Sequence, residues 1–187
     1  ELGLSDDDLV VGMVGRYHPL KDHGNFLAAA RGLLDAGVKA RFVLCGLGVD
    51  DTNDELMALV DRLDLGGVTS LLGERNDPQR IMNAFDLGTI SSAGEGFPNV
   101  VCEMMLCGIP CVVTDVGDAA IIVGDTGQVV PSTDAAALAE GWRRMLQLDA
   151  RARHIKGKAA RLRIVRNYSA EAISLRYHQL WSDIVEG

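Results

Sequence analysis

The sequence predicts an α/β domain with a doubly wound parallel sheet, a Rossmann-like architecture, and three observations lead to this prediction. Short apolar runs alternate with amphipathic helical patterns from end to end. Most of these runs are continuously apolar, as expected when helices cover both faces of a parallel sheet. The 187 residues fit one domain, and 48% hydrophobic with 24% charged residues is a globular composition.

Six apolar runs are the candidate strands. They span residues 9–15, 40–46, 68–72, 87–90, 110–114 and 128–130. Connections between parallel strands are right-handed, and ligands of such folds bind outside the carboxyl ends of the strands. We therefore expect any site in the loops that follow the first five runs.

Two helices are predicted in the first third of the chain. Asp22 is placed to cap a helix that Gly37 ends. Thr52 and Glu55 have the spacing of a capping box, ahead of a helix that Gly66 ends.

Further helix signals continue to the end of the chain. Asp77 and Pro78 predict a helix start, and Asp134 and Ser169 each precede an apolar stripe at helical spacing. The charged stretch at residues 151–166 is predicted to be a solvated helix, with a nucleic-acid face as the alternative.

Charge and composition argue against several classes of protein. Lys plus Arg number 18 and Asp plus Glu 26, and the formal net charge of −8 argues against nucleic acid or anionic lipid as the main partner. No apolar run approaches the roughly 18 residues of a membrane span, and no signal peptide opens the sequence, so we expect a cytoplasmic protein. The four cysteines lack metal or redox spacing and are expected to be small buried hydrophobes. Because the first residue is Glu1 rather than Met, we expect a piece of a longer protein.

The first loop places a glycine and two cations ahead of a capped helix. Gly15 and Arg16 follow the first strand, and Lys21 precedes the cap. A guanidinium offers a planar fork and an ammonium a mobile point charge, and both suit a phosphate. The alternative is two exposed cations without a ligand. His18 and His23 lack a carboxylate or cysteine set and are expected to be polar loop residues rather than metal ligands.

The fourth loop has the richest pattern. Gly94 and Gly96 flank Glu95, so the backbone can turn sharply and approach a ligand closely. Pro98 suits a helix start, whose free amides form a natural diphosphate cradle. Glu103 falls about one turn into that helix, where a carboxylate can accept two hydroxyl hydrogen bonds from a ribose. A favourable interaction with the helix dipole is the plain explanation for one such carboxylate, but not for two.

The chain resembles a known family at these residues. Glu95 and Glu103 form an E-x7-E pair around Gly-Phe-Pro-Asn-Val, and Gly-Ile-Pro-Cys-Val-Val-Thr-Asp follows from residue 108. With the opening Val-Gly-Arg loop and the terminal aromatic helix, this combination resembles the carboxy-terminal, donor-binding domain of group 1 (family 4) retaining glycosyltransferases. These enzymes have the GT-B fold of two facing Rossmann-like domains, and the resemblance covers essentially the whole chain.

The resemblance implies a role for each site residue. Arg16 and Lys21 would bind the donor diphosphate and stabilise the leaving group, and Glu95 would contact the donor-sugar hydroxyls as the third catalytic residue. Glu103 would hold the nucleotide ribose. The other donor-binding candidates are Gly15, Gly96, Phe97, Pro98, Asn99 and Val100, together with Arg75 in a loop that would frame the base. Many relatives carry a glutamate where this chain has Gly117-Asp118-Ala119-Ala120, so a role of that loop in donor selection stays open.

The resemblance also implies a domain organisation. Residues 1–187 would form the nucleotide-sugar (donor) binding domain of a hexosyltransferase-type enzyme of polysaccharide biosynthesis. A terminal aromatic helix at about 170–185, with Tyr168, Tyr177 and Trp181, would cross back onto a missing amino-terminal domain. That domain would bring a glycan, lipid-linked or small-molecule acceptor, and any membrane association. The fragment alone is expected to be inactive.

No cofactor and no metal are expected, because the nucleotide sugar is a substrate and fixed cations can stabilise charge that builds on its phosphate. Asp50 and Asp51 have a helix-capping explanation, and the run Asp6–Asp8 precedes the first strand, on the wrong side of the sheet.

Three alternatives remain. A dinucleotide-dependent oxidoreductase would show G-x-G-x-x-G after a strand, but the first loop has only Gly12 and Gly15, and Gly46 and Gly48 lack a third glycine. A GT-B sugar-nucleotide epimerase shares the fold and the donor, and the E-x7-E pair favours a transferase over it. The third alternative is a nucleotide-binding module with no chemistry of its own.

Overall fold

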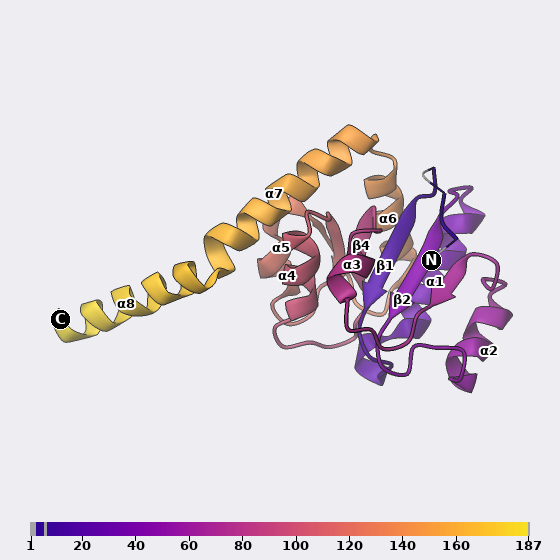
Figure 1. Cartoon of the computed structure of the whole chain (residues 1–187), viewed down its shortest axis with the longest axis horizontal. Helices are drawn as coiled ribbons and strands as arrows, with labels where there is room; N and C mark the ends of the chain where they lie inside the picture. The colour runs from indigo at the N-terminus through magenta and orange to yellow at the C-terminus, as the bar shows by residue number, and fades with distance from the viewer. Residues whose placement is uncertain (1–2, 6, 187) are drawn as a thin grey trace.

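The computed structural model describes residues 3–5 and 7–186, and it has one six-stranded sheet with helices on both faces (Figure 1). Glu1 and Asp6, on which two of the expectations rest, lie outside the described residues. The strands are β1 (Val10–Val14), β2 (Arg41–Cys45), β3 (Thr69–Leu71), β4 (Leu87–Ile90), β5 (Cys111–Thr114) and β6 (Gln128–Val130). The α-helices are α1 (His23–Asp35), α2 (Asp54–Arg62), α3 (Pro78–Met82), α4 (Asn99–Leu106), α5 (Ala119–Val123), α6 (Ala135–Leu146), α7 (Ala150–Tyr168) and α8 (Ala170–Glu186). Two 3-10 turns, η1 (Pro19–Lys21) and η2 (Gly124–Thr126), complete the chain.

The sheet is parallel throughout, with strand order β3-β2-β1-β4-β5-β6. This confirms the predicted doubly wound class, and each predicted strand agrees with the observed one to within one residue at either end. Winding starts at β1 and proceeds outward in one direction to β3 and in the other to β6. The loops after β1 and β4 therefore diverge, which is where such sheets bind ligands.

Three of the predicted helix caps are present. The side chains of Asp22, Asp134 and Ser169 each accept a hydrogen bond from the backbone N–H three residues on, at 3.0, 2.9 and 3.1 Å. Asp77 precedes α3 as predicted, but its carboxylate forms no cap hydrogen bond because it pairs with Arg75 at 2.9 Å.

The predicted capping box at Thr52 and Glu55 is wrong. Asn53 caps α2, with its Oδ1 accepting from Leu56 N at 3.1 Å. Asn53 is fixed in that position because its Nδ2 donates to Gly48 O at 2.7 Å, a contact between loop residues that the local pattern does not reveal.

The end of α2 and the aspartates before it also differ from expectation. The helix ends at Arg62, and Asp64 adopts a left-handed φ of 52° just beyond it, so Gly66 does not end the helix. Asp50 accepts hydrogen bonds from Thr52 and does not cap the helix.

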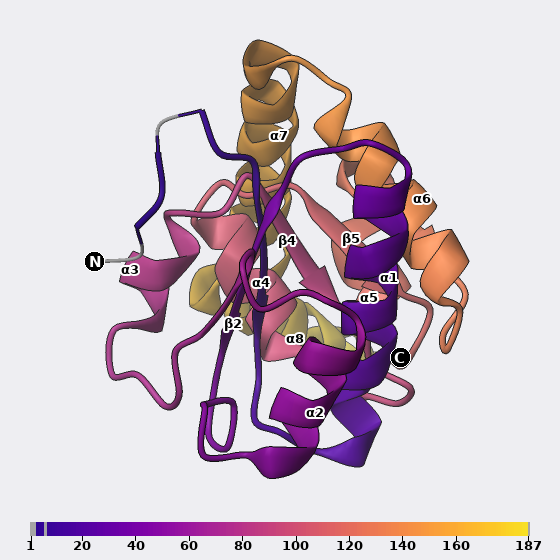
Figure 2. The ribbon, with the colours of Figure 1, turned by 90° about the vertical axis from the view of Figure 1, so that its right-hand side faces the viewer.

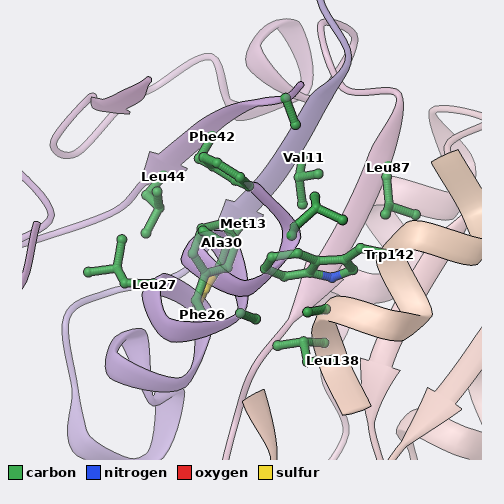
Figure 3. Close-up of a cluster of buried hydrophobic side chains, with 14 of the residues drawn as sticks. Val11, Met13, Phe26, Leu27, Ala30, Phe42, Leu44, Leu87, Leu138 and Trp142 are labelled. Carbon is green, nitrogen blue, oxygen red and sulfur yellow. The ribbon is translucent and has the colours of Figure 1, made fainter. Parts of the chain in front are cut away.

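Aromatic rings lie at the centre of the hydrophobic core on one face of the sheet (Figure 3). The Trp142 ring centroid lies 5.0 Å from that of Phe26 and 6.2 Å from that of Phe42. The indole Nε1 donates to Thr89 Oγ1 at 3.1 Å, so the one polar atom of this buried ring is satisfied. This cluster joins α1, α2 and α6 to the sheet.

A second cluster lies on the opposite face, where residues of α3, α4, α5 and α7 pack against the strands. Figure 2 shows α1 and α6 on one side of the sheet and α3 on the other. Apolar side chains are therefore covered on both faces, which explains the continuous apolar runs of the strands.

The prediction that the four cysteines are small buried hydrophobes holds fully for two of them. Cys45 and Cys111 are buried, Cys102 and Cys107 are half-buried, and all four are free thiols. Burial raises the pKa of each thiol, to about 11 for Cys102. They are therefore poor nucleophiles near neutral pH.

Candidate functional site

A cavity of about 770 Å³ opens at the carboxyl ends of β1 and β4. Its lining comes from the loop after β1, the loop after β4 and the first turns of α4. Of the predicted site residues, the structure brings together Gly15, Arg16, Lys21, Glu95, Gly96, Phe97, Pro98, Asn99, Val100 and Glu103. Val14, His18, Leu20 and Gly94 complete the lining.

The first loop is held in place by backbone contacts with the neighbouring loops. Gly15 N donates to Cys45 O and Tyr17 N to Leu47 O, both at 2.8 Å, and Ala93 N donates to Leu20 O at 2.9 Å. Arg16 is exposed between these contacts, and its side chain has no hydrogen-bond or ion-pair partner in the described part of the chain. A guanidinium in that position is available to an anion in the cavity.

Glu95 is the centre of the polar network. Its Oε1 accepts hydrogen bonds from Lys21 Nζ and Ser92 Oγ, each at 2.6 Å. The Lys21 and Glu95 side chains are 21% and 12% exposed, so this ion pair is shielded from solvent on most sides. Ser91 fixes the approach of the two loops, because its Oγ lies 2.9 Å from both Lys21 O and Asp22 O. Sequence reasoning assigned no role to these serines, and the only available signal was their position directly after β4.

Helix α4 begins at the cavity. Pro98 is its cap residue and Glu103 is exposed on the cavity side, without a side-chain hydrogen bond or ion pair among the described residues. The expectation that all the amides at this helix start are free needs correction. Asn99 N donates to Phe97 O and Val101 N to Pro98 O, both at 3.0 Å, because the chain turns tightly into the helix.

Two glycines outside the cavity lining shape it. A Cβ on Gly46 would lie 2.2 Å from Gly15 O, and a Cβ on Gly117 would lie 2.1 Å from Gly96 O. Gly117 also has a left-handed φ of 50°, and the next residue, Asp118, donates its N–H to Gly96 O at 2.9 Å. This loop, whose role in donor selection the family resemblance left open, therefore supports the backbone beside Glu95.

The structure does not bring Arg75 into this cavity. Arg75 lies in the loop after β3, where its guanidinium holds the Asp77 carboxylate with two hydrogen bonds, at 2.9 and 3.1 Å. The family resemblance placed it among the candidates, in a loop that would frame the base. The side chain instead points to a carboxylate of its own loop.

His23 is not the polar loop residue that was expected. It is the first residue of α1, is 3% exposed, and its ring centroid lies 5.1 Å from that of Tyr17. Burial, with a smaller contribution from the Lys21 ammonium, lowers its pKa to about 4. Neither ring nitrogen has a hydrogen-bond partner in the described region. His23 is therefore a neutral packing element beneath the first loop.

Among the described residues, no group of three or more His, Cys, Asp or Glu side chains is arranged to hold a metal ion. No helix in the same part of the chain is both long and apolar enough to cross a membrane.

Comparison with known proteins finds one matching family and several relatives. The sequence profile of the family described as "Glycosyl transferases group 1" matches residues 8–148. D-inositol 3-phosphate glycosyltransferase of Actinosynnema mirum is 33% identical over 140 residues, which cover 69% of this chain and 34% of the relative. UDP-Gal:alpha-D-GlcNAc-diphosphoundecaprenol alpha-1,3-galactosyltransferase of Escherichia coli is 32% identical over 117 residues, which cover 62% of this chain and 30% of the relative.

A solved structure of similar fold carries ligands. HepE of Anabaena, in complex with UDP and glucose, superposes with a TM-score of 0.82 and 26% sequence identity, over 95% of this chain and 49% of that one. The chain thus spans about a third of the two relatives and about half of HepE.

Proposed function

The chain belongs to the group 1 glycosyltransferases, and from that premise we propose that its cavity binds the nucleoside-diphosphate-sugar donor of a retaining glycosyl transfer. One observation carries the proposal. A single cavity collects two cations, a helix start and two carboxylates at the point where the winding of the sheet reverses. Family membership leaves the oxidoreductase alternative without support.

The cations fit the diphosphate. Arg16 is unpaired among the described residues, and Lys21 extends into the cavity from η1. Cleavage of a glycosyl–phosphate bond builds negative charge on the leaving phosphate, so fixed positive charges stabilise the transition state more than the bound substrate. These two side chains therefore both hold the donor and assist departure of the nucleoside diphosphate.

The carboxylates fit the two sugars of the donor. Glu103, exposed on α4, accepts hydrogen bonds from the ribose hydroxyls. Glu95, held by Lys21 and Ser92, accepts hydrogen bonds from the transferred sugar. Because the lysine neutralises the Glu95 carboxylate, Glu95 can lie close to the donor phosphate without strong repulsion.

We propose UDP as the nucleotide, supported by HepE, whose structure holds UDP in a similar fold. The two relatives differ in acceptor, an inositol phosphate in one name and a diphosphoundecaprenol-linked sugar in the other. We place the acceptor site on the amino-terminal domain of the full-length protein. The exposed apolar residues of α8, among them Tyr177 and Trp181, would pack on that domain. Tyr168, expected on the same helix, ends α7 instead.

Ligand binding by the 187-residue chain tests the donor site. UDP at a hundred times its dissociation constant should stabilise the fold by about 2.7 kcal/mol, measured as a melting shift. Uridine should give no comparable shift, since it lacks the diphosphate. Replacing both Arg16 and Lys21 with alanine should abolish the melting shift. Replacing the exposed Lys39 and Arg62 with alanine, as a matched control, should not. No shift with millimolar UDP, GDP or ADP would contradict the proposal.

The chemistry is tested on the full-length enzyme with UDP-sugar and a panel of acceptors. We expect a product that retains the anomeric configuration of the donor, and no turnover by the 187-residue chain alone. Transfer requires donor and acceptor to be held in contact with water excluded, and the described residues provide one doubly wound unit. Epimerised nucleotide sugar as the product would favour the epimerase alternative.

A further inference from the structure

Helix α7 concentrates the positive charge of an acidic chain. The chain carries a formal charge of −8, yet seven of its 18 Lys and Arg residues lie within Ala150–Tyr168, and no Asp or Glu does. The net charge argues against anionic partners for the chain as a whole. It does not describe this helix, where the local charge has the opposite sign.

One face of α7 is packed and the opposite face is free. Gly157, Ala160 and Ile164 are buried against the domain, and a Cβ on Gly157 would lie 1.8 Å from Gly108 O. The predicted solvated helix is thus solvated on one side only. The close backbone contact fixes which residues face outward.

The outward face carries cations and aliphatic side chains together. Arg151, Ile155, Lys158, Leu162 and Arg166 follow one another at spacings of three or four residues, which places them on one side of the helix. Ile155, Leu162 and the adjacent Val165 are 58%, 52% and 46% exposed. Exposed aliphatic side chains interleaved with cations are unusual on a merely solvated helix.

The cations of this face have no partner among the described residues, whereas three arginines on other sides of α7 do. Arg153, Arg161 and Arg163 point back to the domain, where they donate to backbone carbonyls. Arg151, Lys158 and Arg166 have no hydrogen-bond or ion-pair partner in the part of the chain that the structure describes. Their charges are therefore available to a ligand outside the domain.

We propose that the outward face of α7 docks on an anionic lipid bilayer surface. Phosphate headgroups would neutralise Arg151, Lys158 and Arg166, while Ile155 and Leu162 enter the boundary of the acyl region. A nucleic acid explains the cations but not the exposed aliphatic side chains. A second copy of the same face would place cation against cation and repel it.

Docking through this face would bring the cavity near the lipid. Tyr168 ends α7, and its ring centroid lies 5.8 Å from that of Phe97, which lines the cavity. Because α7 runs from Ala150 to Tyr168, the Arg166 end of the face is the end next to the cavity and the Arg151 end is the farther one. The face shares no residue with the cavity, so the inference stands or falls independently of nucleotide binding.

Sedimentation with vesicles tests the proposal on the whole chain. We expect binding to equal parts phosphatidylcholine and phosphatidylglycerol, weakening as salt rises, and no binding to phosphatidylcholine alone. The triple variant R151E/K158E/R166E should lose about 100-fold or more in affinity, since each cation near an anionic surface contributes about a factor of five or more. The matched control K39E/R62E/R80E makes the same change in net charge at exposed positions elsewhere and should keep most of the binding.

A second variant separates insertion from charge. I155S/L162S keeps every cation and should weaken vesicle binding several-fold while leaving the salt dependence unchanged. Both sites are exposed, and unchanged melting temperatures would confirm that the variants fold.

Several results would overturn the proposal. One is the absence of binding to anionic vesicles. Another is an equal loss of vesicle affinity in the triple variant and in its control. A third is tighter binding of the chain to duplex DNA or RNA than to vesicles. A lipid-independent dimer that the triple variant abolishes would instead identify the face as a contact between copies.

Discussion

Lys21 Nζ and Glu95 Oε1 lie 2.6 Å apart, although 74 residues separate them in the sequence. The contact joins the loop after β1 to the loop after β4, across the point where the sheet winds in opposite directions. A diphosphate in the cavity would compete with Glu95 for the same ammonium. In the proposed donor site, recognition of the phosphate and recognition of the sugar would therefore be coupled through this pair.

Replacing Lys21 should weaken binding of UDP far more than binding of uridine. Loss of a hydrogen bond to a charged group corresponds to about 1.5–3 kcal/mol, roughly a 10- to 150-fold loss in UDP affinity. Titration calorimetry of Lys21→Ala measures it, with Lys39→Ala, at an exposed site away from the cavity, as the control. Equal UDP affinity in both variants would remove Lys21 from the diphosphate site.

The two glutamates should have separable effects. Glu103→Ala should lower affinity for UDP itself by about 1.5–3 kcal/mol, because a charged hydrogen bond to the ribose is lost. Glu95→Ala should spare UDP, since it frees Lys21, yet reduce the preference for UDP-sugar over UDP. Calorimetry with both ligands compares the variants, and Glu171→Ala on α8 is the matched control. Equal losses for both ligands in both variants would contradict these roles.

Nucleotide binding should survive removal of divalent metal. In the proposed donor site Arg16 and Lys21 would supply the positive charge that a metal would otherwise provide, so UDP affinity should change little in EDTA. The measurement is calorimetry before and after chelation. A tenfold loss that magnesium or manganese restores would mean that binding depends on a metal site.

Gly117→Ala should disturb the Glu95 loop from outside the cavity. The new Cβ would meet Gly96 O at 2.1 Å in a left-handed backbone conformation, which should cost about 1–3 kcal/mol of unfolding free energy. Urea denaturation measures this loss, and selectivity for UDP-sugar should fall with it. Gly66→Ala, which has open space around its Cβ, is the control and should be neutral. A stable variant of normal selectivity would show that the loop has no supporting role.

Stability should depend on pH through His23. Its pKa is about 4 in the folded protein and about 6.5 unfolded, so the unfolded state binds more protons between those values. The stabilisation is complete above about pH 6.5 and is lost as the pH falls toward 4, by about 1–1.5 kcal/mol between pH 7.5 and 5.5. In His23→Phe that part of the pH dependence should vanish, whereas the exposed His154→Phe should keep it. Urea denaturation at several pH values measures the free energy of unfolding. If this free energy changed with pH in the same way in wild type and in His23→Phe, the assignment to His23 would be contradicted.

The local sequence pattern predicted a structural feature correctly wherever residues of a single segment form that feature. Asp22 and Asp134 cap helices as predicted because their carboxylates bond backbone three residues on, within the same segment. The prediction failed at Thr52, where a neighbour with equal capping ability, Asn53, is fixed by Gly48 O from the preceding loop. It also failed for His23, because burial under Tyr17 depends on how α1 packs.

The sequence by itself determined the six strands, the doubly wound class and the two loops that form the cavity, because apolar runs, caps and glycines act over a few residues. Only the tertiary structure decided that Lys21, Ser92 and Glu95 meet, that Arg75 lies outside the cavity, and that Gly117 supports the Glu95 loop. It also decided which cations of α7 remain free, because burial of Gly157 against Gly108 orients the helix. Contacts of this kind depend on strand order and close backbone packing, which bring together residues that no local spacing relates.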